Sequence, residues 1–139
     1  MTIRPLVSKD VPAVHVIRLR VRENRLRNPK VVQEADYLTF MARDTMSWVC
    51  EVDGVIAGFV MVDAEKQNLW ALFVAPEQEG KGIGRTLHDA MFLWYFNRRT
   101  ALRLTTAPDT RAASFYSKAG YACLGPTDDG KELIFELRK

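Results

Sequence analysis

Three closely spaced glycines are the residues of this chain best suited to bind an anion. Gly80, Gly82 and Gly84 alternate with Lys81 and an isoleucine, and Arg85 follows them. Glycine has no Cβ, so a ligand can approach the backbone closely. The first N–H groups of a helix have no intrahelical partner and lie at the positive end of its dipole. If a helix begins here, the segment predicts a phosphate site.

Two common nucleotide-binding loops do not match this segment. The triphosphate loop requires Gly, four residues and then Gly-Lys-Ser or Gly-Lys-Thr, and the chain has no such string. The dinucleotide fingerprint requires a third spaced glycine where the chain has Arg85, and it belongs to an opening βαβ unit. The remaining alternative is an ordinary glycine-rich turn.

The residues on either side of the glycines predict a strand and a helix. The apolar run 69–75 has the length of a buried strand, and Pro76 ends it. From Ile83 onward, apolar residues recur at helical spacing. The predicted buried stripe of this helix is Ile83, Leu87, Ala90, Met91 and Trp94.

A second segment, from Asp109 to Tyr121, predicts a short helix that Gly120 ends. One face of this helix carries Ala112, Phe115, Tyr116 and Ala119. Together, Val-Ala-Pro-Glu-x-x-Gly-Lys-Gly-Ile-Gly-Arg and Ala-x-x-Phe-Tyr-x-Lys-Ala-Gly-Tyr resemble the GNAT superfamily of acyl-CoA-dependent N-acyltransferases. The match is specific from Leu69 to Tyr121, and outside it only the order of elements agrees.

The resemblance implies an α/β fold with a mixed, mostly antiparallel sheet of about six or seven strands flanked by about four helices. In this fold the strands corresponding to 69–75 and 101–106 splay apart, and the pantetheine arm of the cofactor lies between them. The resemblance implies that the cofactor acetyl-CoA is bound by Leu72, Phe73, Val74, Glu79, Gly80, Lys81, Gly82, Ile83, Gly84, Arg85, Asp109, Ala112 and Phe115.

Two of these positions depart from the family pattern. Glu79 lies where the family usually has Arg or Gln, so phosphate binding must depend on backbone N–H groups with help from Lys81 and Arg85. The alternative for both basic side chains is plain solvent exposure. Asp109 lies where the family often has an Asn, and it could equally be only the N-cap of its helix.

The implied activity is N-acetylation of a primary amine of a small molecule or protein, by direct attack through a tetrahedral intermediate. The leaving thiolate needs a proton, and a phenol keeps its proton at pH 7. The matching family residue is Tyr116, which we expect to be the general acid. The alternative is that Tyr116 is an aromatic core residue whose hydroxyl reaches a backbone carbonyl.

The base that takes the proton of the amine is not assigned. Many relatives carry a Glu at the position of Ala71, and alanine cannot serve. Glu51, Asp63 and Glu65 are weak substitutes, because each also fits an ordinary surface carboxylate. A water held by backbone carbonyls is the other alternative.

On the acceptor side we expect Arg22, Arg25 and Trp48 to contribute, and the arginines favour an acidic or zwitterionic substrate. A solvated basic face is the alternative interpretation of the arginines. A rival function is a non-catalytic CoA-binding sensor or subunit. Nucleic-acid binding is not expected, because the arginine-rich helix lacks aromatic residues for base stacking.

Composition fits these expectations. The chain has 139 residues, 47% of them hydrophobic and 27% charged, which fits one globular domain. The resemblance implies that this is a single N-acetyltransferase domain over 1–139. The net charge of +3 is compatible with an anionic cofactor. No run of residues is long and apolar enough for a membrane span, so the cytoplasm is the expected location. The resemblance is compatible with a homodimer that has Trp70 or Phe92 at its contact, and burial of both residues within one chain is an equal alternative.

We expect the two cysteines, Cys50 and Cys123, to be buried reduced thiols. His15 and His88 have no Cys or His at ligand spacing, so we expect ordinary helix residues and no metal.

The rest of the chain predicts a mixed sheet with further helices. We expect strands at 2–6, 46–52 and 55–62, with a tight hairpin at Asp53-Gly54, and closing strands at 121–124 and 133–137. Ser8 is the expected N-cap of a helix reaching about Asn24, with Val11, Val14, Ile17 and Val21 buried. A shorter helix should span 31–43, with Val32, Ala35, Tyr37, Leu38 and Met41 packing.

Overall fold

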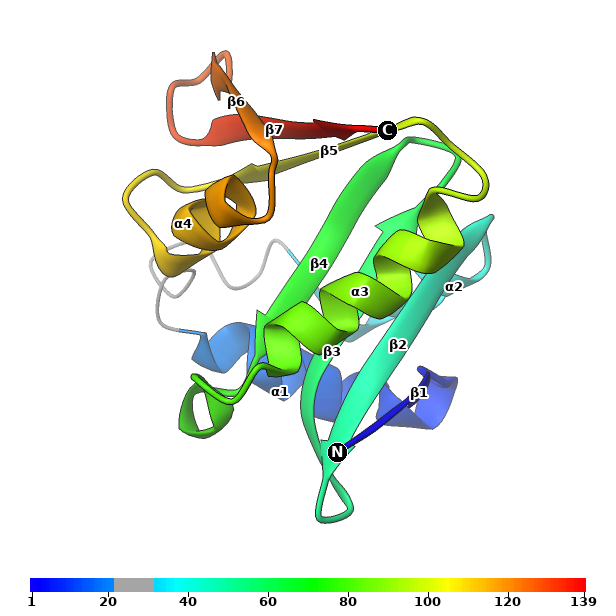
Figure 1. Ribbon diagram of the computed structural model, residues 1–139. Helices are drawn as coiled ribbons and strands as arrows, with labels where there is room; N and C mark the ends of the chain where they lie inside the picture. The colour runs from blue at the N-terminus through cyan, green and yellow to red at the C-terminus, as the bar shows by residue number, and fades with distance from the viewer. Residues whose placement is uncertain (22–31) are drawn as a thin grey trace.

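A computed structural model describes residues 1–21 and 32–139 of the chain. These residues form seven strands, four α-helices and two short 3₁₀ helices (Figure 1). The strands are β1 (Thr2–Pro5), β2 (Thr45–Val52), β3 (Val55–Asp63), β4 (Asn68–Val74), β5 (Ala101–Thr106), β6 (Ala122–Pro126) and β7 (Leu133–Arg138). The helices are η1 (Ser8–Asp10), α1 (Val11–Arg20), α2 (Glu34–Met41), η3 (Pro76–Gln78), α3 (Ile83–Tyr95) and α4 (Arg111–Lys118).

The strands form one sheet in the order β1-β2-β3-β4-β5-β7-β6. All neighbouring pairs are antiparallel except β4 and β5, which are parallel and connected through α3. The expected mixed, mostly antiparallel sheet is therefore confirmed. The Asp53-Gly54 hairpin is also confirmed, because both residues have positive φ, as the tight turn between right-twisted strands requires.

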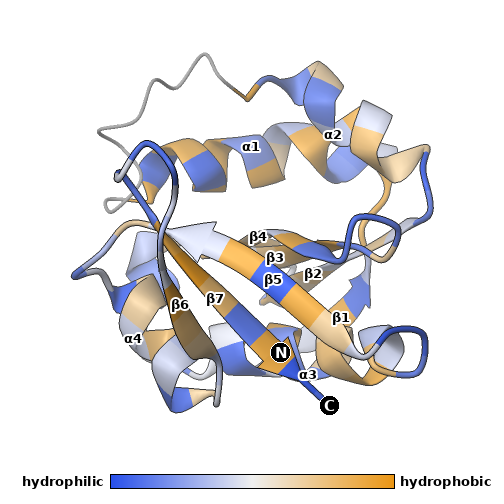
Figure 2. Ribbon diagram, turned by 90° about the horizontal axis from the view of Figure 1, so that it is seen from above, coloured by the Kyte–Doolittle hydropathy of each residue, from blue (hydrophilic) through white to orange (hydrophobic). Residues whose placement is uncertain are grey.

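The helices cover both faces of the sheet, with α1 and α2 on one side and α3 and α4 on the other (Figure 2). Each side has its own hydrophobic core. Under α3, the core is centred on residues such as Leu87, Met91 and Leu102, and under α1 and α2 on residues such as Val14, Tyr37 and Phe59.

Helix α1 buries the predicted stripe of Val11, Val14 and Ile17, and Val21 after it is also buried. The prediction of Ser8 as its N-cap is wrong. The Asp10 carboxylate instead accepts a hydrogen bond from the Val7 N–H at 2.9 Å, and the chain first makes a 3₁₀ turn. The predicted extension toward Asn24 lies partly outside the described residues.

Helix α2 is shorter than predicted, and its buried face is different. Tyr37 is fully buried as expected, but Ala35 and Leu38 are exposed and Phe40 takes their place in the core. Phe40 stacks on Trp70 of β4, with the ring centroids 4.7 Å apart. Tyr37 lies edge-on to the same indole at 5.5 Å.

Strands β4 and β5 part from each other, and a bulge accompanies the separation. Their only register pair among the described residues is Asn68 with Arg103. In the pairing with β3, Met61 lies opposite Ala71 and the next residue, Val62, opposite Leu69, so Trp70 is an extra residue in β4. A bulge bends its strand. Beyond it, β4 and β5 diverge to form a V (Figure 1).

Both cysteines are free thiols, as expected. Cys50 is buried, but the prediction that Cys123 is buried is wrong. Cys123 lies on β6, an edge strand whose first three residues face solvent. No helix within the described part of the chain has the length and apolar character needed to cross a bilayer.

Candidate functional site

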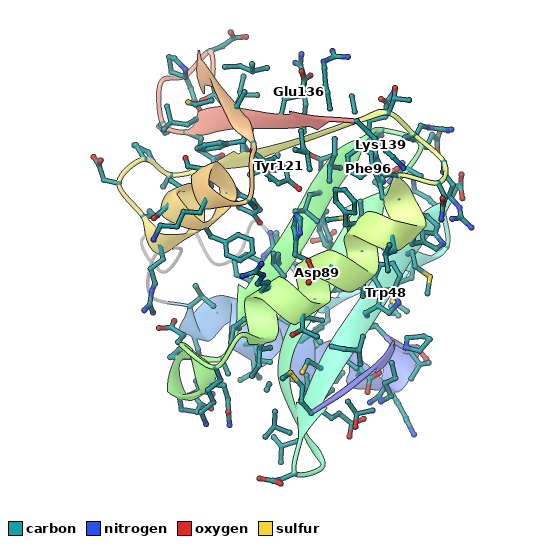
Figure 3. The ribbon with its side chains drawn as sticks, in the orientation of Figure 1. Trp48, Asp89, Phe96, Tyr121, Glu136 and Lys139 are labelled. Atoms are coloured by element: carbon teal, nitrogen blue, oxygen red, sulfur yellow. The ribbon has the colours of Figure 1, made fainter. Side chains whose placement is uncertain are left out.

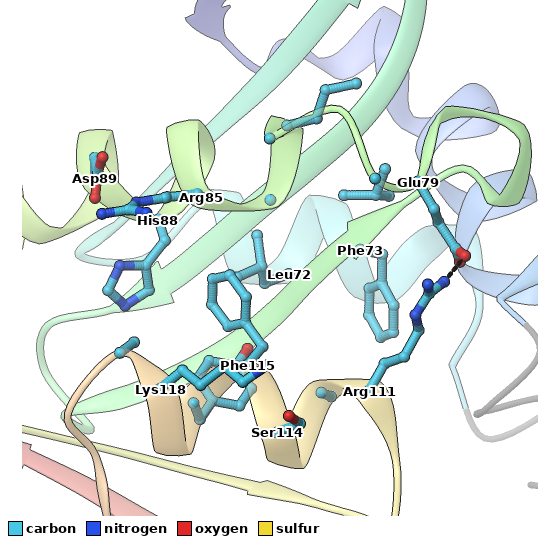
Figure 4. A pocket seen from close by; sticks show the side chains of 18 of the residues that line it. Leu72, Phe73, Glu79, Arg85, His88, Asp89, Arg111, Ser114, Phe115 and Lys118 are labelled. Carbon is cyan, nitrogen blue, oxygen red and sulfur yellow. Dashed lines mark ion pairs between the residues drawn. The ribbon is translucent and has the colours of Figure 1, made fainter.

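A cavity of about 850 Å³ lies where the end of β4 meets α3 and α4. Its walls come from Val21, the end of β4, the glycine loop with α3 as far as Phe92, and α4 with the residue after it. The predicted residues that line it are Leu72, Phe73, Val74, Glu79, Gly80, Gly82, Ile83, Gly84, Arg85, Ala112, Phe115 and Tyr116. Two segments that are far apart in sequence, the glycine loop and α4, therefore face one another across one cavity (Figure 4).

The glycine loop presents unpaired backbone N–H groups to this cavity. The first intrahelical hydrogen bond at this end of α3 runs from the Thr86 N–H to the Gly82 carbonyl at 3.0 Å. Among the described residues, none accepts a hydrogen bond from the N–H groups of residues 80–85. Gly82 is the N-cap, with φ of 79°, and this left-handed conformation is why glycine is needed there. The loop can thus bind an anion, as its sequence predicts.

The charged side chains of the loop take different positions. Arg85 lines the cavity, whereas Lys81 is exposed and donates a hydrogen bond to the Gln78 side chain at 3.0 Å. Glu79 forms an ion pair with Arg111, the first residue of α4 (Figure 4). This pairing compensates the carboxylate that the sequence placed beside the expected phosphate site.

The N-cap of helix α4 lies one residue later than Asp109, the residue considered for it from the sequence. Thr110, and not Asp109, is its N-cap, because the Thr110 hydroxyl accepts a hydrogen bond from the Ala113 N–H at 3.1 Å. Asp109 has a positive φ of 57° and is exposed, and its side chain is not part of the cavity wall. Gly120 follows the helix with φ of 98°, which agrees with its predicted role as the C-terminal stop.

Tyr116 of α4 lies in the wall of the cavity and is almost fully buried. Its ring contacts those of Tyr121 and Phe135, at centroid distances of 5.2 and 6.2 Å. No hydrogen bond joins its hydroxyl to another described residue, and the hydroxyl is also absent from the fully buried polar atoms that lack a partner. The oxygen is therefore not bonded to a core carbonyl and retains some accessible surface, in a residue that lines the cavity. Burial raises the pKa of Tyr116, so the phenol keeps its proton at neutral pH.

His88 of α3 also lines the cavity, which the sequence prediction missed. Its Nε2 atom shares a hydrogen bond with the Tyr121 hydroxyl at 2.8 Å, and its ring lies edge-on to Phe115 at 5.8 Å. Desolvation lowers the pKa of His88, with Asp89 acting weakly in the opposite direction, so the imidazole is neutral at pH 7. The available signal was its spacing: His88 lies one helical turn after Gly84, and so on the same side of α3.

Of the residues predicted for the acceptor side, only Trp48 is described, and it does not line this cavity. Trp48 packs edge-on against Trp94 at 6.1 Å, on the side of α3 that faces away from α4 (Figure 3). Arg22 and Arg25 lie outside the described residues. Arg18, one turn earlier, is half-buried with its guanidinium 5.0 Å from the ring of Phe73, which does line the cavity.

The aromatic residues considered for a dimer contact pack within the chain. Trp70 lies against α2, and Phe92 packs against the core under α3 and lines the cavity.

The carboxylates considered as a base form ion pairs elsewhere. Glu51 pairs with Arg4, and Asp63 and Glu65 both pair with Arg43, at 2.8 and 3.5 Å. Ala71, at the position of the family glutamate, is buried on the α1 and α2 side of the sheet. Among the described residues, no group of three or more His, Cys, Asp or Glu side chains has the arrangement of a metal site.

A protein-family model described as an acetyltransferase (GNAT) domain matches residues 43–123. This match spans the predicted glycine loop and α4. Curated protein sequences gave no match.

Solved structures resemble the whole chain. The ribosomal-protein-S18-alanine N-acetyltransferase from Escherichia coli has a TM-score of 0.77 at 22% identity, covering 97% of this chain and 90% of that one. An N-acetyltransferase from Staphylococcus aureus Mu50 has a TM-score of 0.82 at 18% identity, covering 99% of this chain and 97% of that one. The paia N-acetyltransferase from Thermoplasma acidophilum, solved in complex with coenzyme A, has a TM-score of 0.81 at 20% identity, covering 100% of both chains. At these identities the likeness establishes the fold.

Proposed function

The chain belongs to the GNAT acetyltransferase family, and we propose that it transfers the acetyl group of acetyl-CoA to a primary amine of a small molecule or protein. One observation carries the proposal: the start of α3, with its unpaired N–H groups, and Tyr116, whose hydroxyl has no partner among the described residues, line the same cavity. The first can hold phosphate groups and the second can supply a proton, and the reaction needs both.

The cavity is compatible with acetyl-CoA as co-substrate. The N–H groups of residues 80–85, together with Arg85, bind the pyrophosphate. The end of β4, from Leu72 to Val74, faces the cavity and lacks a paired neighbour toward β5, so its backbone groups can pair with the amides of the pantetheine arm. Phe115 and Ala112 supply the apolar wall opposite.

The chemistry that acetyl-CoA supplies is a thioester whose carbonyl a neutral amine attacks directly. Tyr116 donates its proton to the leaving sulfur, and the proton lost by the amine restores the phenol, so the cycle balances. The amine must first be neutral, although the usual pKa of an ammonium group is about 10. Since the candidate carboxylates form ion pairs elsewhere, we propose that water in the cavity removes the proton of the ammonium group before the attack. The second proton, which the nitrogen loses after the attack, is the one that restores the phenol.

The direct test is incubation of the protein with acetyl-CoA and a panel of small amines and peptides. Acetylated product should be followed by mass spectrometry and free CoA by chromatography, because a thiol reagent would also react with the exposed Cys123. Product that depends on the amine supports the transferase. CoA binding with no acetylated product from any amine would favour the rival CoA-binding module.

A further inference from the structure

A buried hydrogen bond between two side chains joins the two halves of the cavity wall. It adds to the Glu79–Arg111 ion pair at the edge of the cavity and to the bond from the Tyr95 hydroxyl of α3 to the Ala101 carbonyl of β5, away from the cavity. His88 belongs to α3, which packs on β2, β3 and β4. Tyr121 follows α4 and belongs to the half built on β5, β7 and β6 (Figure 3). Since β4 and β5 pair at a single register position, few backbone bonds fix the distance between these halves. The His88–Tyr121 bond at 2.8 Å therefore connects elements that the sheet holds only loosely.

Tyr121 is in direct contact with the proposed general acid. Its ring lies edge-on to that of Tyr116 at 5.2 Å, and its N–H donates to the Tyr116 carbonyl at 3.0 Å. Tyr121 is buried but does not line the cavity, so it does not itself meet a bound ligand. The orientation of its ring determines one side of the space that the Tyr116 ring occupies.

We propose that His88 and Tyr121 are positioning residues, which hold Tyr116 at the place where its hydroxyl meets the leaving sulfur. This inference rests on the proposed acetyl transfer. The hydrogen bond fixes the Tyr121 ring, the ring supports Tyr116, and His88 anchors both to the wall that carries the phosphate loop. A displacement of the acid by a fraction of an ångström slows a proton transfer without preventing cofactor binding.

Burial favours this arrangement. Desolvation lowers the pKa of His88 and raises that of Tyr121, so both groups are neutral at physiological pH. A hydrogen bond between two neutral buried groups needs no counter-charge, and loss of either partner leaves the other unsatisfied.

The test compares four variants: Tyr121→Phe, His88→Leu, the double variant and His88→Gln, whose amide can still bond to the Tyr121 hydroxyl. In Tyr121→Phe we expect kcat to fall about tenfold with KM for acetyl-CoA changed less than about twofold. The double variant should be no slower than the slower single variant, because both remove the same bond. His88→Gln should keep kcat within about threefold of wild type.

Tyr95→Phe is the matched control. Tyr95 is a fully buried tyrosine of α3 whose hydroxyl donates to the Ala101 carbonyl at 2.5 Å, away from the cavity. It should lose stability but keep kcat. Unchanged kcat in Tyr121→Phe, an equal fall in Tyr95→Phe, or additive losses in the double variant would each overturn the positioning role.

A second readout does not require activity. The chain has four tyrosines, so the ¹³Cζ resonance of Tyr116 can be assigned by its loss in Tyr116→Phe. Tyr121→Phe and His88→Leu should both shift or broaden this resonance, and Tyr95→Phe should leave it in place. An unmoved resonance overturns the inference even if the enzyme is active. A shifted resonance in a protein that acetylates no amine supports the positioning and rejects the transferase.

Discussion

The Glu79 carboxylate and the Arg111 guanidinium form an ion pair that joins the glycine loop to the start of α4 (Figure 4). Both side chains are partly exposed, at 34% and 63%, so the pair lies at the solvent edge of the cavity. Exposed ion pairs contribute little to stability. The effect of this pair should therefore be on the charge that a bound phosphate encounters.

Glu79→Gln should tighten binding of coenzyme A about threefold, because it removes a negative charge near the phosphates and leaves Arg111 in place. Arg111→Gln should weaken binding, since Glu79 would then be uncompensated. Isothermal titration calorimetry with coenzyme A at two salt concentrations measures both effects, which should shrink at the higher concentration. Weaker binding in Glu79→Gln would contradict this account of the loop.

Tyr116→Phe removes the proposed proton donor while keeping the ring that packs against Tyr121 and Phe135. We expect kcat to fall about a hundredfold with little change in the affinity for acetyl-CoA. Steady-state kinetics and calorimetry together separate the two quantities. If turnover is unchanged, Tyr116 has no part in the proton transfer.

Gly82→Ala should weaken coenzyme A binding, because a Cβ at a φ of 79° is strained and tilts the N–H groups that follow. The strain costs about 1 kcal/mol of folding free energy. Gly130→Ala is the matched control, since Gly130 has a similar φ of 71° in the turn between β6 and β7, away from the cavity. Both variants should lose similar stability in chemical unfolding, and only Gly82→Ala should lose affinity.

The two cysteines should react differently with a thiol reagent. Cys123 is exposed, whereas Cys50 is fully buried and its burial raises the pKa of the thiol. In the folded protein we expect rapid labelling of one thiol per chain, and of two after unfolding. Cys123→Ser should abolish the rapid phase. A rapid phase that persists in this variant would place Cys50 within reach of solvent.

His88 should make stability fall in mild acid. Its folded-state pKa lies below the usual 6.5 because of desolvation, so the unfolded chain binds the proton more readily. His88 therefore has no effect on the free energy of unfolding at pH values above 6.5, the usual pKa of histidine. The free energy of unfolding decreases as the pH falls from 6.5 toward the lower pKa of the folded state. Urea unfolding at about pH 7.5 and about pH 5.5 should show a smaller decrease in His88→Gln than in wild type. Equal decreases would mean that another group is responsible.

Local patterns in the sequence were sufficient for most of the fold. Apolar alternation and helical spacing identified the strands and helices, and Asp53-Gly54 identified the hairpin, because these features depend on neighbours in the chain. The ends of elements were less certain: Val7 and Asp10 replaced Ser8 at the start of α1, and Thr110 replaced Asp109 before α4. Several polar residues can cap a helix, and tertiary contacts decide which one does.

The sequence by itself determined that a glycine loop precedes a helix, and that a phenol lies on a later helix with family spacing. Only the tertiary structure decided that Tyr116 lies in the wall of the cavity, that Glu79 is paired with Arg111, and that His88 reaches Tyr121. These relationships join residues on opposite sides of the gap between β4 and β5. The distances between these residues depend on the bulge at Trp70 and on how far β4 and β5 diverge. The separation of the two strands cannot be predicted from the periodicity of the sequence.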